Sequence, residues 1–157
     1  MVLLHLPEGR HSQLAEIFEH HTLMQVREAT DKESLAPGML YFAPPGCHLL
    51  IETDHSFSLS GEAPVHFSRP SIDVLMESAA DAYGVHLAGI LLTGANADGA
   101  AGLAKIGRQG GLAVIQDPAE AQMATMPEAA IRQRQPDLIL DLKDIRSLLL
   151  KMGKNSC

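Results

Sequence analysis

Two side chains far apart in the sequence, an imidazole and a carboxylate, are the first candidates for chemistry. Asp98 lies in the stretch AGILLTGANADGAAG at residues 88–102, whose pattern predicts an apolar strand, a loop and a small-residue helix. His5 ends an apolar run at residues 2–5 that predicts a buried strand. In an α/β sheet, ligands and catalytic groups lie at the carboxyl ends of strands. A carboxylate there can hold an imidazole in one tautomer and stabilise its protonated form.

Structural interpretations of the same residues stay open. Asp98 can be a helix N-cap, and His5 can be a strand terminus with a satisfied ring. The loop TGANADG is also a candidate anion site, because Gly94 and Gly99 have the spacing of a nucleotide-binding loop. Ala100 stands where such a loop has lysine, however, and no G-x-G-x-x-G motif is present. Since any helix start offers free amides, an anion-binding α/β protein remains one alternative.

Three further residues are candidates for a role at this site. Arg69 lies near the strand ends, where its guanidinium could meet a substrate carboxylate or hold an acid such as Asp73. Ser12 and Cys47 are candidate nucleophiles. A serine at the start of a helix usually caps it. Cys47 precedes His48, but neighbours on a strand point to opposite faces, and a lone thiol is commonly part of the core.

Cofactors and metals are not expected. The sequence has no H-E-x-x-H motif and no Cys/His ligand spacing. Four other histidines are assigned to loops or to a polar helix end: His11, His20, His21 and His55.

Strand and helix patterns alternate through most of the chain. The expected strands lie at residues 2–5, 23–29, 39–42, 48–53, 56–60, 85–93, 112–116 and 138–140. The expected helices begin at Ser12, Ser71, Asp98-Gly99, a capping box at Thr125-Met-Pro-Glu128, and Asp141. Right-handed crossovers between these elements predict an α/β fold: a doubly wound, mostly parallel sheet with helices on both faces. The turn at residues 54–55 predicts an antiparallel β-hairpin near one edge.

The sequence predicts further features of two of these helices. The helix after Ser71 should end at Gly84. The last helix should turn four apolar side chains inward: Ile145, Leu148, Leu149 and Met152.

Composition excludes several classes of function. The chain has 157 residues, 46% of them hydrophobic and 4% aromatic, which suits one domain with an aliphatic core. A net charge of −7 with scattered basic residues argues against nucleic-acid binding. The two cysteines form no disulfide framework, and no apolar run is long enough to insert into a membrane or serve as a signal peptide. We therefore expect a cytoplasmic protein.

Five blocks of the sequence together resemble the catalytic domain of the chemotaxis receptor methylesterases, the CheB family, in its stand-alone form. The blocks, in the order of the family, are VLLHLPEG, APGMLYFAPPGCHLLIE, SRPSIDVL, LLTGANADGAAGL and GGLAVIQDPAEA followed by MP. Ser68 departs from the family, in which many members have histidine before the Arg-Pro pair, and Cys47 is not typical. The resemblance implies one methylesterase-like domain over residues 1–157.

The resemblance implies a cofactor-free serine hydrolase that acts on methylated chemoreceptor cytoplasmic helices. It would remove methyl groups from glutamate γ-methyl esters, with glutamine deamidation as a further reaction. His5 matches the family's base and Asp98 its orienting acid. Gly94 and Ala95 match a region that the family uses near its oxyanion site, and Arg69 is a candidate for substrate binding.

The family's nucleophile has no counterpart in this sequence. It lies in a G-A-S-T-G-G-like turn after the first strand, upstream of the histidine, and only four residues precede His5. Loss of such a nucleophile costs on the order of a millionfold in turnover. We expect that a strand-helix unit of roughly 30 residues upstream of Met1, or another chain, fills this position. The alternative is a non-catalytic protein-binding module derived from the family.

Overall fold

The computed structural model describes residues 1–5, 14–22 and 24–154. Its strands are β1 (Gln25–Glu28), β2 (Met39–Phe42), β3 (His48–Ile51), β4 (Phe57–Ser60), β5 (Ala88–Leu91), β6 (Leu112–Gln116) and β7 (Leu138–Leu140). Its helices are α1 (Leu14–Glu19), α2 (Ile72–Tyr83), α3 (Ala100–Arg108), α4 (Thr125–Gln133) and α5 (Leu142–Lys154), with a 3-10 helix η1 (Gly84–His86) before β5. The predicted alternation of strands and helices is confirmed.

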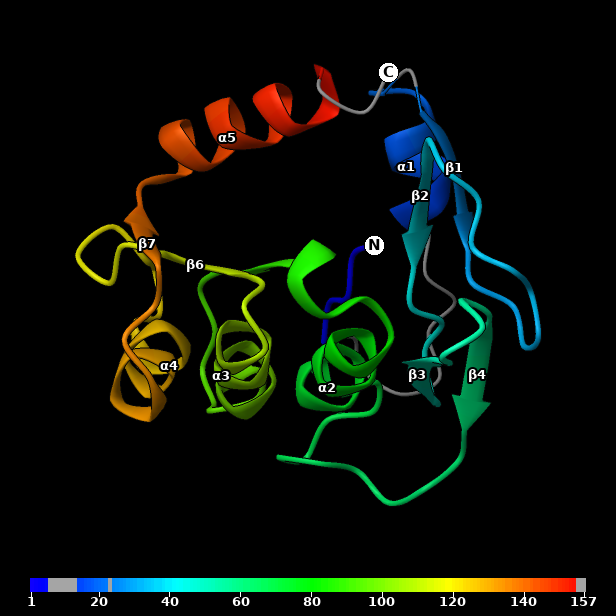
Figure 1. Cartoon of the computed structure of the whole chain (residues 1–157), viewed down its shortest axis with the longest axis horizontal. Coiled ribbons are helices and arrows are strands. Elements are labelled where there is room, and N and C mark those ends of the chain that lie inside the picture. Colours follow the sequence, from blue (N-terminus) through cyan, green and yellow to red (C-terminus); the bar gives the residue numbers. More distant parts are fainter. Residues whose placement is uncertain (6–13, 23, 155–157) are drawn as a thin grey trace.

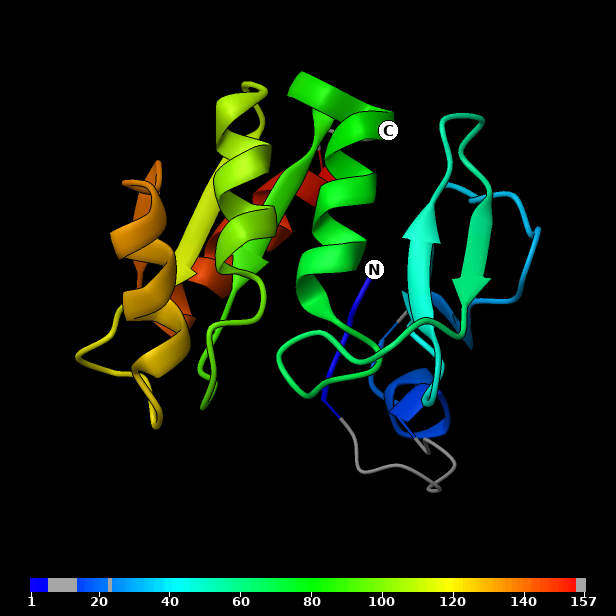
Figure 2. The ribbon, with the colours of Figure 1, turned by 90° about the horizontal axis from the view of Figure 1, so that it is seen from below.

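The sheets have the predicted directions. β5, β6 and β7 pair in parallel in that order, and β1 pairs in parallel with β2. β3 and β4 form the predicted antiparallel hairpin. Helices α2, α3 and α4 lie side by side on one face of β5–β6–β7, and α5 lies on the other face (Figures 1 and 2). The structure is therefore a mostly parallel α/β fold with helices on both faces.

The amino-terminal segment is shorter as a strand than predicted. Within residues 2–5, only Val2 makes a bridge, which is parallel to Phe42. Its N–H donates to the Tyr41 carbonyl at 2.8 Å, and its carbonyl accepts from the Ala43 N–H at 3.0 Å. This pairing places Val2 beside β2, and the segment continues from there to His5.

Helix α2 joins the two parts of the core. Ser71 caps its start and Gly84 ends it, as predicted from the sequence. On one side Leu75 and Ala79 pack with β2, β3 and β4, while on another side Ala80 packs with β5, β6 and α3.

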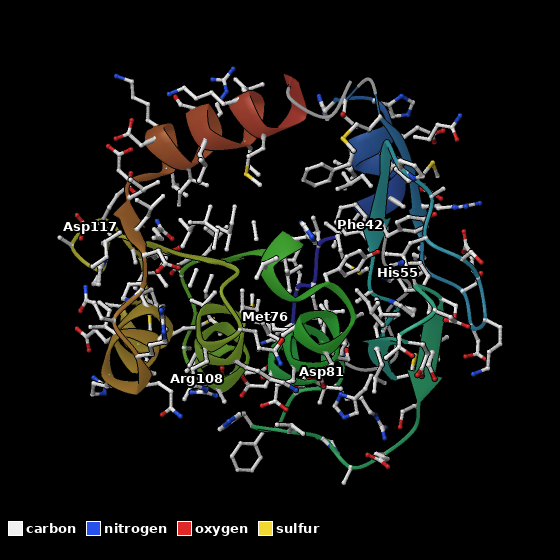
Figure 3. All side chains as sticks on the ribbon, in the orientation of Figure 1. Phe42, His55, Met76, Asp81, Arg108 and Asp117 are labelled. Atoms are coloured by element: carbon white, nitrogen blue, oxygen red, sulfur yellow. The ribbon has the colours of Figure 1, made fainter. Side chains whose placement is uncertain are left out.

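Glycine lets α2 and α3 approach closely. Met76 of α2 lies against Gly102 of α3, where an added Cβ would be 2.6 Å from the Met76 Cβ (Figure 3). This contact fixes the start of α2 next to the loop that precedes α3.

Two local predictions were wrong. Helix α4 begins after Ala124 with no side-chain cap, so Thr125 lies inside the helix instead of capping it. In α5, Ile145 is buried, but Leu149 is 52% exposed and Met152 is 37% exposed. The apolar residues of α5 have helical spacing, as predicted, but Leu149 and Met152 are not buried.

Candidate active site

His5 and Asp98 meet although 93 residues separate them. His5 follows the Val2 bridge, and Asp98 lies in the loop between β5 and α3. Figure 2 shows the end of the amino-terminal segment, the loop before α2 and the loop after β5 along the same lower edge of the molecule. The His5 Nε2 is 2.7 Å from the Asp98 Oδ2. The Asp98 side chain is fully buried, whereas that of His5 is 28% exposed.

Asp98 accepts hydrogen bonds from the first residues of α2. Its Oδ1 accepts from the Ser71 hydroxyl at 2.7 Å and from the Asp73 N–H at 2.9 Å. Its Oδ2 accepts from the Ile72 N–H at 2.7 Å, beside His5. The start of a helix favours negative charge because its amides lack partners within the helix. Asp98 is thus bound to α2, and the interpretation of Asp98 as the cap of its own helix is wrong, because Gly99 occupies that position.

These bonds keep the carboxylate ionised. Burial alone would raise the pKa of Asp98, but hydrogen bonds from His5, Asp73, Ser71 and Ile72 outweigh it and hold the pKa below its ordinary value. An ionised carboxylate only accepts, so the imidazole proton lies on Nε2. The lone pair on Nδ1 is then left to accept a proton from another group. The pair can therefore act as an oriented general base.

The buried part of the site contains residues that sequence reasoning missed. Ser71 was predicted as a helix cap but not as a donor to Asp98. His48, only 2% exposed, accepts from the Ser71 N–H through Nδ1 at 3.1 Å, and its Nε2 bonds the Ala63 carbonyl at 3.0 Å. The sequence signal was weak: a histidine at the start of a strand, and a serine that already had a role as a cap.

Asp73 is the second buried carboxylate of the site. Its Oδ1 accepts from the Gly102 N–H at 2.8 Å, and its Oδ2 is 3.4 Å from the His66 Nε2. Burial raises the pKa of Asp73, and the charge of Asp98 raises it further. Two neighbouring carboxylates therefore have pKa values shifted in opposite directions.

The loop after β5 uses one of its two candidate oxyanion groups internally. The Gly94 N–H donates to the Met123 carbonyl at 3.1 Å, and the Gly94 carbonyl accepts from the Met126 N–H at 3.0 Å. A Cβ on Gly94 would collide with the Met126 side chain. The next residue, Ala95, is exposed, and its N–H donates to no group in the described part of the chain. Of the two, the Ala95 amide is the one that can reach a ligand.

Arg69 contacts its own loop. Its Nη1 donates to the carbonyls of Gly61 and Glu62 at 3.2 and 3.1 Å. The guanidinium therefore holds the connection between β4 and α2 in place.

The candidate nucleophiles do not meet His5 in what the structure describes. Ser12 lies outside the described residues. Burial raises the pKa of the Cys47 thiol, so it is protonated and a poor nucleophile. Both ring nitrogens of His48 are bonded elsewhere, so Cys47 and His48 form no catalytic pair.

Residues 1–5, 14–22 and 24–154 contain no cluster of three or more His, Cys, Asp and Glu that could hold a metal ion. Within the same ranges, every helix is too short or too polar to cross a bilayer.

Sequence comparison finds relatives along nearly the whole chain. A model of the CheB methylesterase family matches residues 1–149. A protein of Leptospira interrogans named protein-glutamate methylesterase/protein-glutamine glutaminase is 44% identical over 156 residues, which are 99% of this chain and 81% of the relative. A protein of the same name from Bordetella parapertussis is 36% identical over 154 residues, 96% of this chain and 44% of the relative. The chain thus spans less than half of the Bordetella protein.

A solved structure agrees with these matches. The crystal structure of the Thermotoga maritima CheB methylesterase catalytic domain superimposes with a TM-score of 0.88 at 27% identity. The match covers 96% of this chain and 81% of the Thermotoga chain.

Proposed function

Because the chain belongs to the CheB methylesterase family, we propose that it supplies the base of a protein-glutamate methylesterase that demethylates chemoreceptor helices. The substrates are glutamate γ-methyl esters on the cytoplasmic helices of chemoreceptors, and glutamine side-chain amides follow the same steps. The observation that carries the proposal is the 2.7 Å contact between the His5 Nε2 and the fully buried Asp98 carboxylate. No cofactor or metal takes part in this reaction.

In the proposed reaction, His5 accepts and returns one proton in each of two half-reactions. A serine oxygen attacks the ester carbonyl carbon while its proton passes to the His5 Nδ1, and Asp98 stabilises the resulting imidazolium. The ring then gives this proton to the departing methoxide, which leaves as methanol. Water, deprotonated by the same nitrogen, finally attacks the acyl carbon. As the bond to serine breaks, the ring returns this proton to the serine oxygen, which releases glutamate and the free serine.

Two neighbouring loops support this reaction. The exposed amide of Ala95 donates to the carbonyl oxygen as negative charge develops on it. Gly94 makes this possible by leaving room for Met126, which anchors the loop. Arg69 contributes to substrate binding indirectly, because its guanidinium holds residues 61–70 beside the site.

The serine comes from a strand-helix unit outside the 157 residues, paired between the amino-terminal segment and β5. Within the described residues, β5 pairs only with β6, and Val2 pairs only with β2. A strand edge with unpaired backbone groups beside an apolar core is costly. The comparisons support such a unit, because this chain covers 81% of both the Leptospira relative and the Thermotoga domain.

Serine-directed labelling tests the proposal. Protein purified from its own cells is treated with a fluorophosphonate and analysed by intact mass. We expect one adduct on a serine that follows an apolar strand and is flanked by glycines, and none after His5→Gln. An intact mass above 16.9 kDa, or a second chain bound to this one, would identify the source of the serine.

The opposite results have defined meanings. If the purified protein carries no adduct while it binds the receptor, the chain is a non-catalytic binding module. If the 157-residue chain alone is an active monomer, the strand-helix unit is unnecessary. Because the proposed substrate helices are cytoplasmic, fractionation should find the protein in the cytoplasm.

A further inference from the structure

A tight turn at residues 65–68 has an unusual backbone for its residue types. The Val65 N–H donates to the Ser68 carbonyl at 3.1 Å, and the Ser68 N–H donates to the Val65 carbonyl at 2.9 Å. The two residues between them, His66 and Phe67, have φ angles of 48° and 62°. A two-residue turn with both φ angles positive normally contains asparagine and glycine. Bulky residues remain in it only when their surroundings hold them there.

The surroundings that hold this turn are the loop between β5 and α3 and the start of helix α2. The Asn96 side chain donates from Nδ2 to the His66 carbonyl at 3.2 Å, and its Oδ1 accepts from the Asp98 N–H at 3.0 Å. The His66 ring also lies 3.4 Å from the Asp73 carboxylate. One asparagine side chain therefore connects the turn with the residue that orients His5.

The Phe67 ring gains no stabilisation from burial within the fold. Its side chain is 104% exposed, the highest value among the large apolar side chains that the structure describes. The contact with Asp73 explains the position of His66, whereas the fully exposed Phe67 ring makes no such contact with the described residues. A rigid aromatic ring held in solvent loses little conformational entropy when a partner covers it.

We propose that Phe67 is a docking residue for the substrate helix, packing on an apolar side chain next to the methylated glutamate. The inference rests on the proposed function, which supplies the partner: a helix that must lie across the edge where His5 and Asp98 meet. The connection between β4 and α2 runs along that edge (Figure 2). Phe67 then determines which helix surface is accepted, while His5 and Asp98 determine the chemistry.

The test compares affinity with thermal stability in the 157-residue chain. The probe is a fluorescently labelled, methylated cytoplasmic fragment of a chemoreceptor, and its Kd is measured by anisotropy. Phe67→Gly removes the ring and also suits a positive φ, so we expect binding to weaken by about tenfold or more while the Tm stays equal or rises. Phe67→Tyr keeps the ring and should bind as the wild type does. Val85→Ala, on η1 at the other end of β5 and 64% exposed, is the matched control and should change neither value.

The outcomes separate this inference from the proposed function. Wild-type affinity in Phe67→Gly overturns the inference and leaves the proposed function standing. Weaker binding in Phe67→Gly, together with a native protein that takes no fluorophosphonate adduct, supports the docking surface and overturns the hydrolase. Failure of the wild-type chain to bind the methylated fragment overturns the docking surface, and the labelling experiment then judges the hydrolase alone.

Discussion

Replacing Asp98 with asparagine should destabilise the fold strongly, although the two side chains have nearly the same shape. Each Asp98 oxygen accepts one bond from a backbone amide of α2, either Ile72 or Asp73. An asparagine side chain keeps only one oxygen, so one of these amides loses its acceptor wherever the NH₂ group points. A buried donor left without a partner costs about 1–3 kcal/mol. Loss of the charge at the helix start adds up to about 2 kcal/mol.

The expected loss is therefore about 2–4 kcal/mol in the free energy of unfolding, measured by urea denaturation at pH 7. Asp73→Asn is the control, since it makes the same change in the same cluster. An asparagine oxygen can still accept from the Gly102 N–H, and burial already raises the pKa of Asp73 and favours its neutral form. We expect Asp73→Asn to stay within about 1 kcal/mol of the wild type.

The pH dependence gives a second check with a defined sign. The folded pKa of Asp98 lies below the unfolded value of about 3.9. The charge of Asp98 therefore stabilises the fold fully above that value, and this contribution is lost as pH falls through the folded pKa. Asp73 has the opposite shift, so its contribution is lost as pH rises through its folded pKa. An Asp98→Asn protein as stable as Asp73→Asn, or a deficit that persists unchanged in strong acid, would refute the reasoning.

Three other predictions follow from single contacts. His5→Ala should raise the pKa of Asp98, because burial then meets one hydrogen bond fewer; a carboxyl ¹³C NMR titration that shows no rise would contradict this. Gly99→Ala should lower the Tm more than Gly38→Ala, since both glycines have positive φ but only a Cβ on Gly99 meets other side chains; equal losses would argue against crowding. Cys47 should react slowly with iodoacetamide at pH 7, because burial raises its thiol pKa; rapid labelling in a peptide mass map would show a reactive thiol.

Local patterns predicted the elements that depend on local physics. The bounds expected for β2, β6 and β7 agree with the structure, and α2 begins after Ser71 and ends at Gly84. Caps, glycine and apolar periodicity act within a few residues of each other, so the sequence carries them directly.

Predictions that depend on a neighbouring element were weaker. The apolar residues of α5 have the predicted helical spacing, but Leu149 is exposed. Spacing alone does not determine which elements pack against a helix. The position of Asp98 after an apolar strand indicates a functional residue. That the amides of α2 would bind it was not predictable, since those amides carry no side-chain signal.

The start of α2 holds the buried Asp98 carboxylate through three hydrogen bonds. The Ser71 hydroxyl oxygen accepts from the Val74 N–H, and the hydroxyl donates to Asp98. The Ser71 N–H donates to the His48 Nδ1. The same donors that keep Asp98 ionised also fix the direction of its oxygens, and thus the proton on the His5 Nε2. In the proposed reaction, His5 is held both by Asp98 and by the pairing of Val2 with β2, whichever polypeptide brings the serine. The hydrogen bond between His5 and Asp98 can therefore be measured in this chain without an assay of turnover.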